Sequence, residues 1–185
     1  MIELSYLSIS KDWYGDPVQP ALDVGLVIED QHLVFGGRRK APAVNVDGFK
    51  ALEFYEGLWE ADCVELFLGF VGSERYLEIN LAPNGSWAIF VFSNYRKREE
   101  VLSDYTPKVF SKSDKDSWAS QIKIEKNLLL DNLLNSEVQQ GKAETFLYNI
   151  TGVLADSHKL RYLTLESGTQ TEPDFHLDNL RKTKL

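Results

Sequence analysis

The segments DCVELFLGF (Asp62–Phe70), YLEINL (Tyr76–Leu81) and WAIFVFS (Trp87–Ser93) carry the strongest structural signal in this chain. Each is rich in aliphatic and aromatic residues, which are favoured in strands, and turn residues follow each of the first two. The second of these turns contains an Asn-Gly pair, which favours a hairpin because both residues tolerate a positive φ. The sequence therefore predicts three antiparallel strands joined by short turns.

The rest of the chain repeats this strand-rich pattern. One helix is expected, over Lys126–Gln139, where leucines form a short apolar stripe. The mixed-charge run Arg96–Glu100 is interpreted as a solvated loop. Many short strands with turns between them favour a single all-β domain over residues 1–185, a two-sheet antiparallel β-sandwich of immunoglobulin-like or jelly-roll-like type with at most one short helix. Further strands are predicted at Leu22–Ile28, His32–Phe35 (ended by Gly36–Gly37), Ser117–Glu125, Phe146–Leu154 and Leu160–Leu165.

Composition excludes several classes of function. The net charge of −8 over 185 residues argues against nucleic acid as a partner, because phosphate binding needs clustered Lys and Arg. The same charge disfavours anionic membrane surfaces, and the longest apolar run is too short to span a bilayer. Because the N-terminal residues form neither a basic nor an apolar stretch, we expect a cytoplasmic protein whose single cysteine, Cys63, is reduced.

Alternation along the central strands separates two faces. Leu77, Ile79 and Leu81 share one face, which we expect in the core, while Tyr76, Glu78 and Asn80 share the other. Pairing with the preceding strand brings Glu65 onto that second face. Carboxylates and a carboxamide bind vicinal hydroxyls, and an aromatic ring covers the apolar side of a pyranose, so this face suits a sugar. The alternative is that it is only the solvated face of an antiparallel sheet.

Tryptophans are the candidate platforms for stacking on such a sugar. Trp59 and Trp87 stand at junctions between a loop and a strand, where a ring can reach a ligand. Trp118 alternates in phase with Ile122 and Ile124 and is expected in the core.

Four blocks of the sequence resemble known motifs. Leu58–Leu68 is similar to the signature LWE-x-x-C-x-E-x-F, and Tyr76–Trp87 to Y-x-E-x-N-x-x-P-x-G-x-W. Phe92–Arg96 matches F-x-x-Y-R, and Pro173–His176 matches P-D-F-H. Together they resemble bacterial DOMON-like domains, which are related to family 9 carbohydrate-binding modules. The resemblance implies a β-sandwich whose concave sheet holds a sugar or, in some relatives, a haem.

This resemblance leads to an expected ligand and an expected site. Haem-binding relatives ligate iron through Met and His, but Met1 is the only methionine here, so we expect no haem held in that way. A His158/His176 pair is the remaining route to haem, and a structural calcium ion in a loop is left open. The expected function is non-catalytic binding of a small sugar or oligosaccharide. The expected ligand-binding residues are Trp59, Glu65, Tyr76, Glu78, Asn80, Trp87, Tyr95, Arg96 and His176.

Two alternatives stay open at this point. Glu65 and Glu78 could serve as the acid and base of a glycosidase, since two carboxylates flanking a bond are the minimum machinery for hydrolysis. The same face could instead bind a partner protein.

Overall fold

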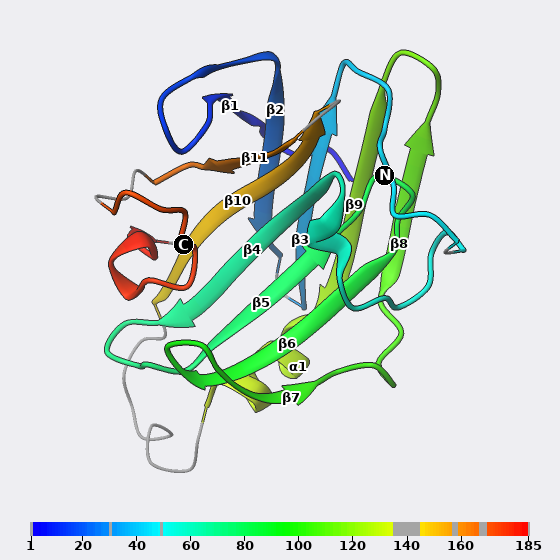
Figure 1. The fold of residues 1–185 in the computed structure, drawn as a ribbon. Coiled ribbons are helices and arrows are strands. Elements are labelled where there is room, and N and C mark those ends of the chain that lie inside the picture. Colours follow the sequence, from blue (N-terminus) through cyan, green and yellow to red (C-terminus); the bar gives the residue numbers. More distant parts are fainter. Residues whose placement is uncertain are drawn as a thin grey trace.

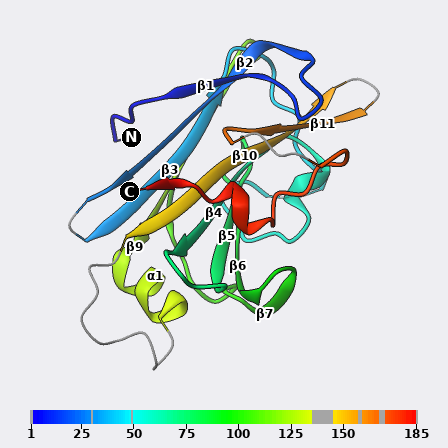
Figure 2. The same cartoon turned by 90° about the vertical axis from the view of Figure 1, so that its left-hand side faces the viewer.

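The computed structural model describes residues 2–29, 31–48, 50–134, 145–156, 159–166 and 170–184, which form two antiparallel sheets packed face to face (Figures 1 and 2). The back sheet has five strands in the order β1 (Leu7–Lys11), β2 (Pro17–Ile28), β3 (His32–Arg39), β9 (Trp118–Glu125) and β8 (Lys108–Ser113). The site sheet runs β11 (Lys159–Thr164), β10 (Phe146–Asp156), β4 (Cys63–Phe70), β5 (Tyr76–Leu81), β6 (Trp87–Asn94) and β7 (Lys97–Val101), with β12 (Thr183–Lys184) paired to β10.

These two sheets confirm the predicted sandwich. Its core lies between them, where side chains such as Leu22, Phe35, Ile79 and Ile122 are fully buried. Trp118 is also in this core, as its phase predicted. The inner face of the site sheet, which meets the back sheet, carries Leu77, Ile79 and Leu81, so the predicted phase of β5 is confirmed.

Strand β3 is longer than the sequence predicted. It continues through Gly36 and Gly37 to Arg39 instead of ending at the glycine pair. A Cβ on Gly36 would lie 2.4 Å from the Ser120 carbonyl oxygen, and one on Gly37 would lie 2.5 Å from Cγ1 of Val64. The two glycines therefore let the β9 backbone and the Val64 side chain of the opposite sheet approach β3 closely. They do not mark a turn.

Three other expectations need correction. The α-helix α1 spans Lys126–Leu133, packs against β5 and β9, and is shorter than predicted, while residues 135–144 lie outside the described ranges. The expected loop at Arg96–Glu100 is mostly the exposed edge strand β7. The strands β1 and β8 were not predicted.

Among the described residues, no helix is long and apolar enough to cross a membrane.

The outer face of the site sheet, which points away from the back sheet, is also covered. Every residue of β4 and β5 is buried, so both faces of these strands are largely covered by other parts of the protein. The short helix η1 (Leu58–Glu60) packs against β5 and β10, and Phe175 joins an aromatic cluster on this face. Figure 1 shows the C-terminal segment, in red, running beside β10 and β4; it includes the short helix η2 (Asp178–Leu180).

Candidate functional site

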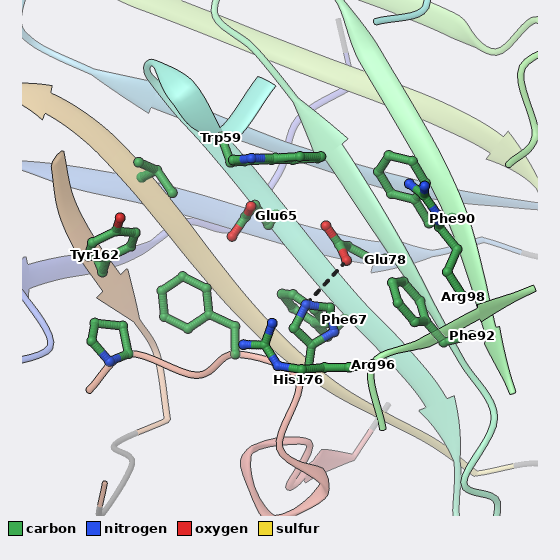
Figure 3. Close-up of a pocket in the computed structure, with 13 residues that line it drawn as sticks. Trp59, Glu65, Phe67, Glu78, Phe90, Phe92, Arg96, Arg98, Tyr162 and His176 are labelled. Atoms are coloured by element: carbon green, nitrogen blue, oxygen red, sulfur yellow. Dashed lines mark ion pairs between the residues drawn. The ribbon is translucent and has the colours of Figure 1, made fainter. Parts of the chain in front are cut away.

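A cavity of about 470 Å³ opens on the outer face of the site sheet (Figure 3). Its floor comes from β4, β5 and β6, and its walls come from η1, β7, β10, β11 and the segment before η2. The lining is mainly aromatic, with two carboxylates, two guanidinium groups and one imidazole. The lining residues are Trp59, Glu65, Phe67, Glu78, Phe90, Phe92, Arg96, Arg98, Val153, Tyr162, Pro173, Phe175 and His176.

Strand register places the two carboxylates together. Glu65 pairs with Asn80 and Phe67 pairs with Glu78 across β4 and β5, so all four side chains share the outer face. Glu65 and Glu78 are therefore diagonal neighbours, a relation in which side chains are within reach of one another. This confirms the prediction that Glu65, Glu78 and Asn80 share one face.

Both carboxyl groups are deeply buried. Glu65 is 4% exposed and Glu78 is 6% exposed, although each lines the cavity. Burial, followed by repulsion from Glu78, raises the pKa of Glu65 to about 8. Burial likewise raises the pKa of Glu78 to about 7. At neutral pH the pair therefore retains a proton, because two adjacent charges cannot both be solvated here.

Each carboxyl group is held by one neutral hydrogen-bond donor. Thr151 Oγ1 donates to Glu65 Oε2 over 2.8 Å, and Asn80 Nδ2 donates to Glu78 Oε1 over 2.8 Å. Asn80 is fully buried and does not line the cavity, so it acts by orienting Glu78. These bonds leave one oxygen of each carboxyl group without a hydrogen bond from any described residue.

His176 stands beside Glu78 as a neutral imidazole. Its Nε2 lies 3.8 Å from Glu78 Oε2, the contact dashed in Figure 3. Burial and the nearby Arg96 charge lower the pKa of His176 to about 4. The Tyr76 hydroxyl accepts the Arg96 backbone N–H over 3.3 Å and lies 2.7 Å from His176 Nδ1. We assign Nδ1 as the acceptor of the Tyr76 hydroxyl, which leaves the Nε2 hydrogen directed toward Glu78.

A polar clasp closes the rim near β7. The Tyr95 hydroxyl donates to Asp174 Oδ2 over 2.5 Å, and Arg96 Nη2 donates to Asp174 Oδ1 over 2.9 Å. The His176 backbone N–H also donates to Asp174 Oδ1, over 3.2 Å. The structure thus brings Tyr95, Arg96 and His176 together, as predicted, through an aspartate that the prediction did not name.

The predicted tryptophan platforms separate into two environments. Trp59 is 38% exposed, lines the cavity, and has its ring centroid 6.1 Å from that of Phe90. Trp87 is only 4% exposed and lies in the core between the sheets, edge-on to Phe54 and Tyr105. The expectation that Trp87 reaches the ligand is therefore corrected: its side chain alternates in phase with Ile89, on the inner face.

Several lining residues were missed by the sequence interpretation. Phe67, Phe90 and Phe92 share the phase of the predicted polar face and could have been found from it. Arg98 was hidden in the segment interpreted as a loop. No sequence signal placed Tyr162, because β11 reaches this face only through its pairing with β10.

The cofactor expectations stay predictions. Within the described ranges, no group of three or more His, Cys, Asp or Glu side chains is placed to hold a metal ion. His158, half of the alternative haem-ligating pair, lies outside the described residues.

Comparisons with known proteins place this chain by its fold. No protein-family model matches the sequence, and no curated protein is similar enough in sequence to match. One similar solved structure is a Bacteroides uniformis protein whose assignment as carbohydrate-binding is provisional, with 16% identity, TM-score 0.75, and coverage of 97% of this chain and 84% of that one. Another is a family 9 carbohydrate-binding module from Caldicellulosiruptor kristjanssonii in complex with cellotriose, with 13% identity, TM-score 0.52, and coverage of 90% and 74%. The chain shares the β-sandwich fold of these proteins over most of their length.

Proposed function

We propose that this protein binds a carbohydrate, without cleaving it, in the cavity on the outer face of the site sheet. The observation that carries the proposal is the combination of an exposed indole, Trp59, with buried carboxyl groups at Glu65 and Glu78 in one cavity. A sugar ring presents an apolar side for stacking and hydroxyl groups for hydrogen bonds. The fold shared with a module solved with cellotriose supports the same ligand class.

The volume of the cavity limits the size of the ligand. A volume of about 470 Å³ falls within the range of small-molecule sites and suits one or two sugar units. A small sugar or the end of an oligosaccharide is therefore the proposed ligand.

Hydrolysis is the second candidate, and the raised pKa of each carboxyl group is the observation that favours it. A glycosidase needs one carboxyl group able to donate a proton at neutral pH. However, Glu65 and Glu78 project from adjacent strands on the same face of the sheet, so both lie on the floor, beneath any ligand. Two groups on one side of the ligand do not flank a glycosidic bond, and this arrangement favours binding over cleavage.

The test is a glycan array followed by calorimetry and a turnover assay on the best ligand. Glu78→Gln keeps the shape of the site but removes its charge, so affinity should fall by about 1.5–3 kcal/mol. Glu100→Gln is the matched control, because Glu100 is exposed on β7 and does not line the cavity. Binding without turnover supports the proposal. Cleavage that is lost in Glu78→Gln assigns the site to the glycosidase alternative, and an array without any bound sugar contradicts both.

A further inference from the structure

The floor of the cavity carries negative charge without a bonded cation. Thr151 and Asn80 are the donors to Glu65 and Glu78, and both are neutral. No described Lys or Arg forms a hydrogen bond or ion pair with either carboxyl group. His176 is near Glu78, but its pKa of about 4 keeps the imidazole neutral at physiological pH. The two buried acids therefore have no bonded partner of opposite charge within the described protein, and the Arg96 and Arg98 charges, which lower the pKa of Glu78, do not outweigh its burial.

The arginines of the cavity are engaged elsewhere. Arg96 forms an ion pair with Asp174, and its nitrogen lies 2.9 Å from the carboxylate oxygen. Arg98 forms an ion pair with Glu56, and its guanidinium lies 5.2 Å from the Phe90 ring centroid. Each arginine thus has its own acidic partner outside the floor. These two ion pairs are each neutral overall. Among the acidic groups that line the cavity, Glu65 and Glu78 therefore have no bonded positive charge.

Aromatic rings surround these acids. Figure 3 shows both carboxyl groups pointing toward the space beside the Trp59 ring, with Phe67, Phe90 and Phe92 around them. The face of an aromatic ring carries negative electrostatic potential and attracts an organic cation, most strongly where water is excluded. Rings around a pair of acids form a typical environment for an ammonium group, whereas a neutral ligand leaves the buried charge uncompensated.

We propose that the sugar bound in this cavity carries a protonated amine, with its ammonium group seated between Glu65 and Glu78, so that the preferred ligand is an amino sugar. This inference rests on the proposed function, since it assigns the ligand class of the same site. The ammonium group would donate to the carboxylate oxygens that Thr151 and Asn80 leave free, while the apolar side of the ring faces Trp59.

Proton linkage provides a signature of this binding mode. The carboxyl pair retains a proton near neutral pH, because burial and mutual repulsion raise the pKa of each member. An ammonium group between them favours the doubly ionised pair, so its binding should release a proton to the buffer. A neutral sugar brings no charge to the pair and should release much less.

The experiment is isothermal titration calorimetry of the full chain with three probes: glucosamine, glucose and N-acetylglucosamine. Each is titrated at pH 7 in two buffers that differ in ionisation enthalpy, so that proton release is counted directly. We expect glucosamine to bind roughly 10- to 100-fold more tightly than glucose, the scale of a hydrogen bond to a charged group. N-acetylglucosamine, which has lost the charge, should lose this advantage and release no proton.

Variants locate the ammonium seat. The double variant Glu65→Gln/Glu78→Gln keeps the volume of both side chains and removes both acidic groups, and should bring the glucosamine-to-glucose affinity ratio close to one. Glu100→Gln, on exposed β7, should leave the ratio unchanged. Melting temperatures recorded with each titration confirm that both variants are folded.

Each outcome bears on one claim. Equal affinity for glucosamine and glucose overturns the amino-sugar inference and leaves the proposed sugar binding intact. A glucosamine preference that persists in Glu65→Gln/Glu78→Gln also overturns the proposed position of the ammonium group. Failure of every sugar on the glycan array and in calorimetry overturns the proposed function together with the inference.

Discussion

The two faces of β5 are equally buried but chemically opposite. On the inner face, Leu77 and Ile79 pack in an aliphatic core that needs no hydrogen bonds. On the outer face, Glu78 and Asn80 are at most 6% exposed and depend on each other for a hydrogen bond. Burying a carboxyl group costs free energy unless it is paired, whereas burying a leucine is favourable. The inner face thus stabilises the fold, and the outer face retains groups suited to a ligand.

The largest expected effect contrasts one tryptophan from each environment. Trp118 is 2% exposed in the core between the sheets, so Trp118→Ala should lower the free energy of unfolding by about 3–5 kcal/mol through the cavity it leaves. Trp59→Ala should cost far less stability, because Trp59 is 38% exposed, and should instead weaken sugar binding. Urea unfolding and calorimetry on both variants measure the two effects. Similar losses of stability in the two variants would contradict the proposed difference between the inner and outer faces.

Neighbouring residues on one strand sharpen the comparison. Ile79→Ala should lower the free energy of unfolding by about 2–5 kcal/mol, because Ile79 is fully buried against the back sheet. Glu78→Gln, one residue away, should be neutral or stabilising at pH 8, since it removes a buried ionisable group whose pKa is raised. Chemical denaturation at pH 8 measures both. A near-neutral Ile79→Ala would mean that the strand phase is inverted.

Near neutral pH, the pH dependence of stability should come mainly from the outer face. In the folded state the pKa values of Glu65 and Glu78 are about 8 and about 7, above their unfolded value of 4.5. The folded state therefore binds more protons, and its stability falls as pH rises through these values. His176 opposes this trend at lower pH, because its folded pKa of about 4 is below the unfolded 6.5.

Between pH 6.5 and 8 the His176 contribution is small, roughly 0.4 kcal/mol and opposite in sign, since the folded imidazole is neutral and the unfolded one is half protonated at pH 6.5. Over that interval the free energy of unfolding should fall by about 2 kcal/mol. Urea titrations at several pH values measure the slope. The double variant Glu65→Gln/Glu78→Gln should be nearly independent of pH there. An unchanged slope in that variant would assign the pH dependence to groups other than this pair.

Sequence patterning predicted which side chains share a face, but not what covers that face. Alternation along β5 correctly separated Ile79 from Glu78, because successive side chains in a strand point to opposite sides. Applied to β6, the same rule puts Trp87 in phase with Ile89, in the core, whereas its position beside a loop had led to the expectation that it lies at the rim. Local pattern is thus sufficient for orientation within a strand.

Long-range packing accounts for what the sequence could not predict. Tyr162 and Phe175 reach the cavity from β11 and the C-terminal segment, which are far in sequence from Glu65 and Glu78. No local periodicity encodes such contacts. The raised pKa of the carboxyl pair has the same origin, since it depends on burial by these distant segments. The sequence therefore predicted the residue types of the site, but it did not predict that distant segments would bury them.

The smallest expected effect tests how the C-terminal segment is held over the outer face. Asp174 accepts hydrogen bonds from Tyr95, Arg96 and the His176 backbone. Burial alone would raise the pKa of Asp174, but the hydrogen bonds from Tyr95 and Arg96 outweigh it and hold the pKa below its usual value.

Asp174→Asn keeps the shape of this clasp and removes its charge. Because the Arg96 side chain is 52% exposed, solvent screens the ion pair and the stability cost should stay below about 1 kcal/mol. Sugar affinity should fall by a similar free energy, roughly fivefold, because His176 and Phe175 lose part of their positioning. Calorimetry with the best ligand measures the affinity, and Asp104→Asn at an exposed turn is the control. A variant with lowered stability but full affinity would show that the clasp supports the fold and not the cavity. Loss of affinity with no more than this small stability cost is the result expected if the outer face binds the ligand while the inner face carries most of the stability.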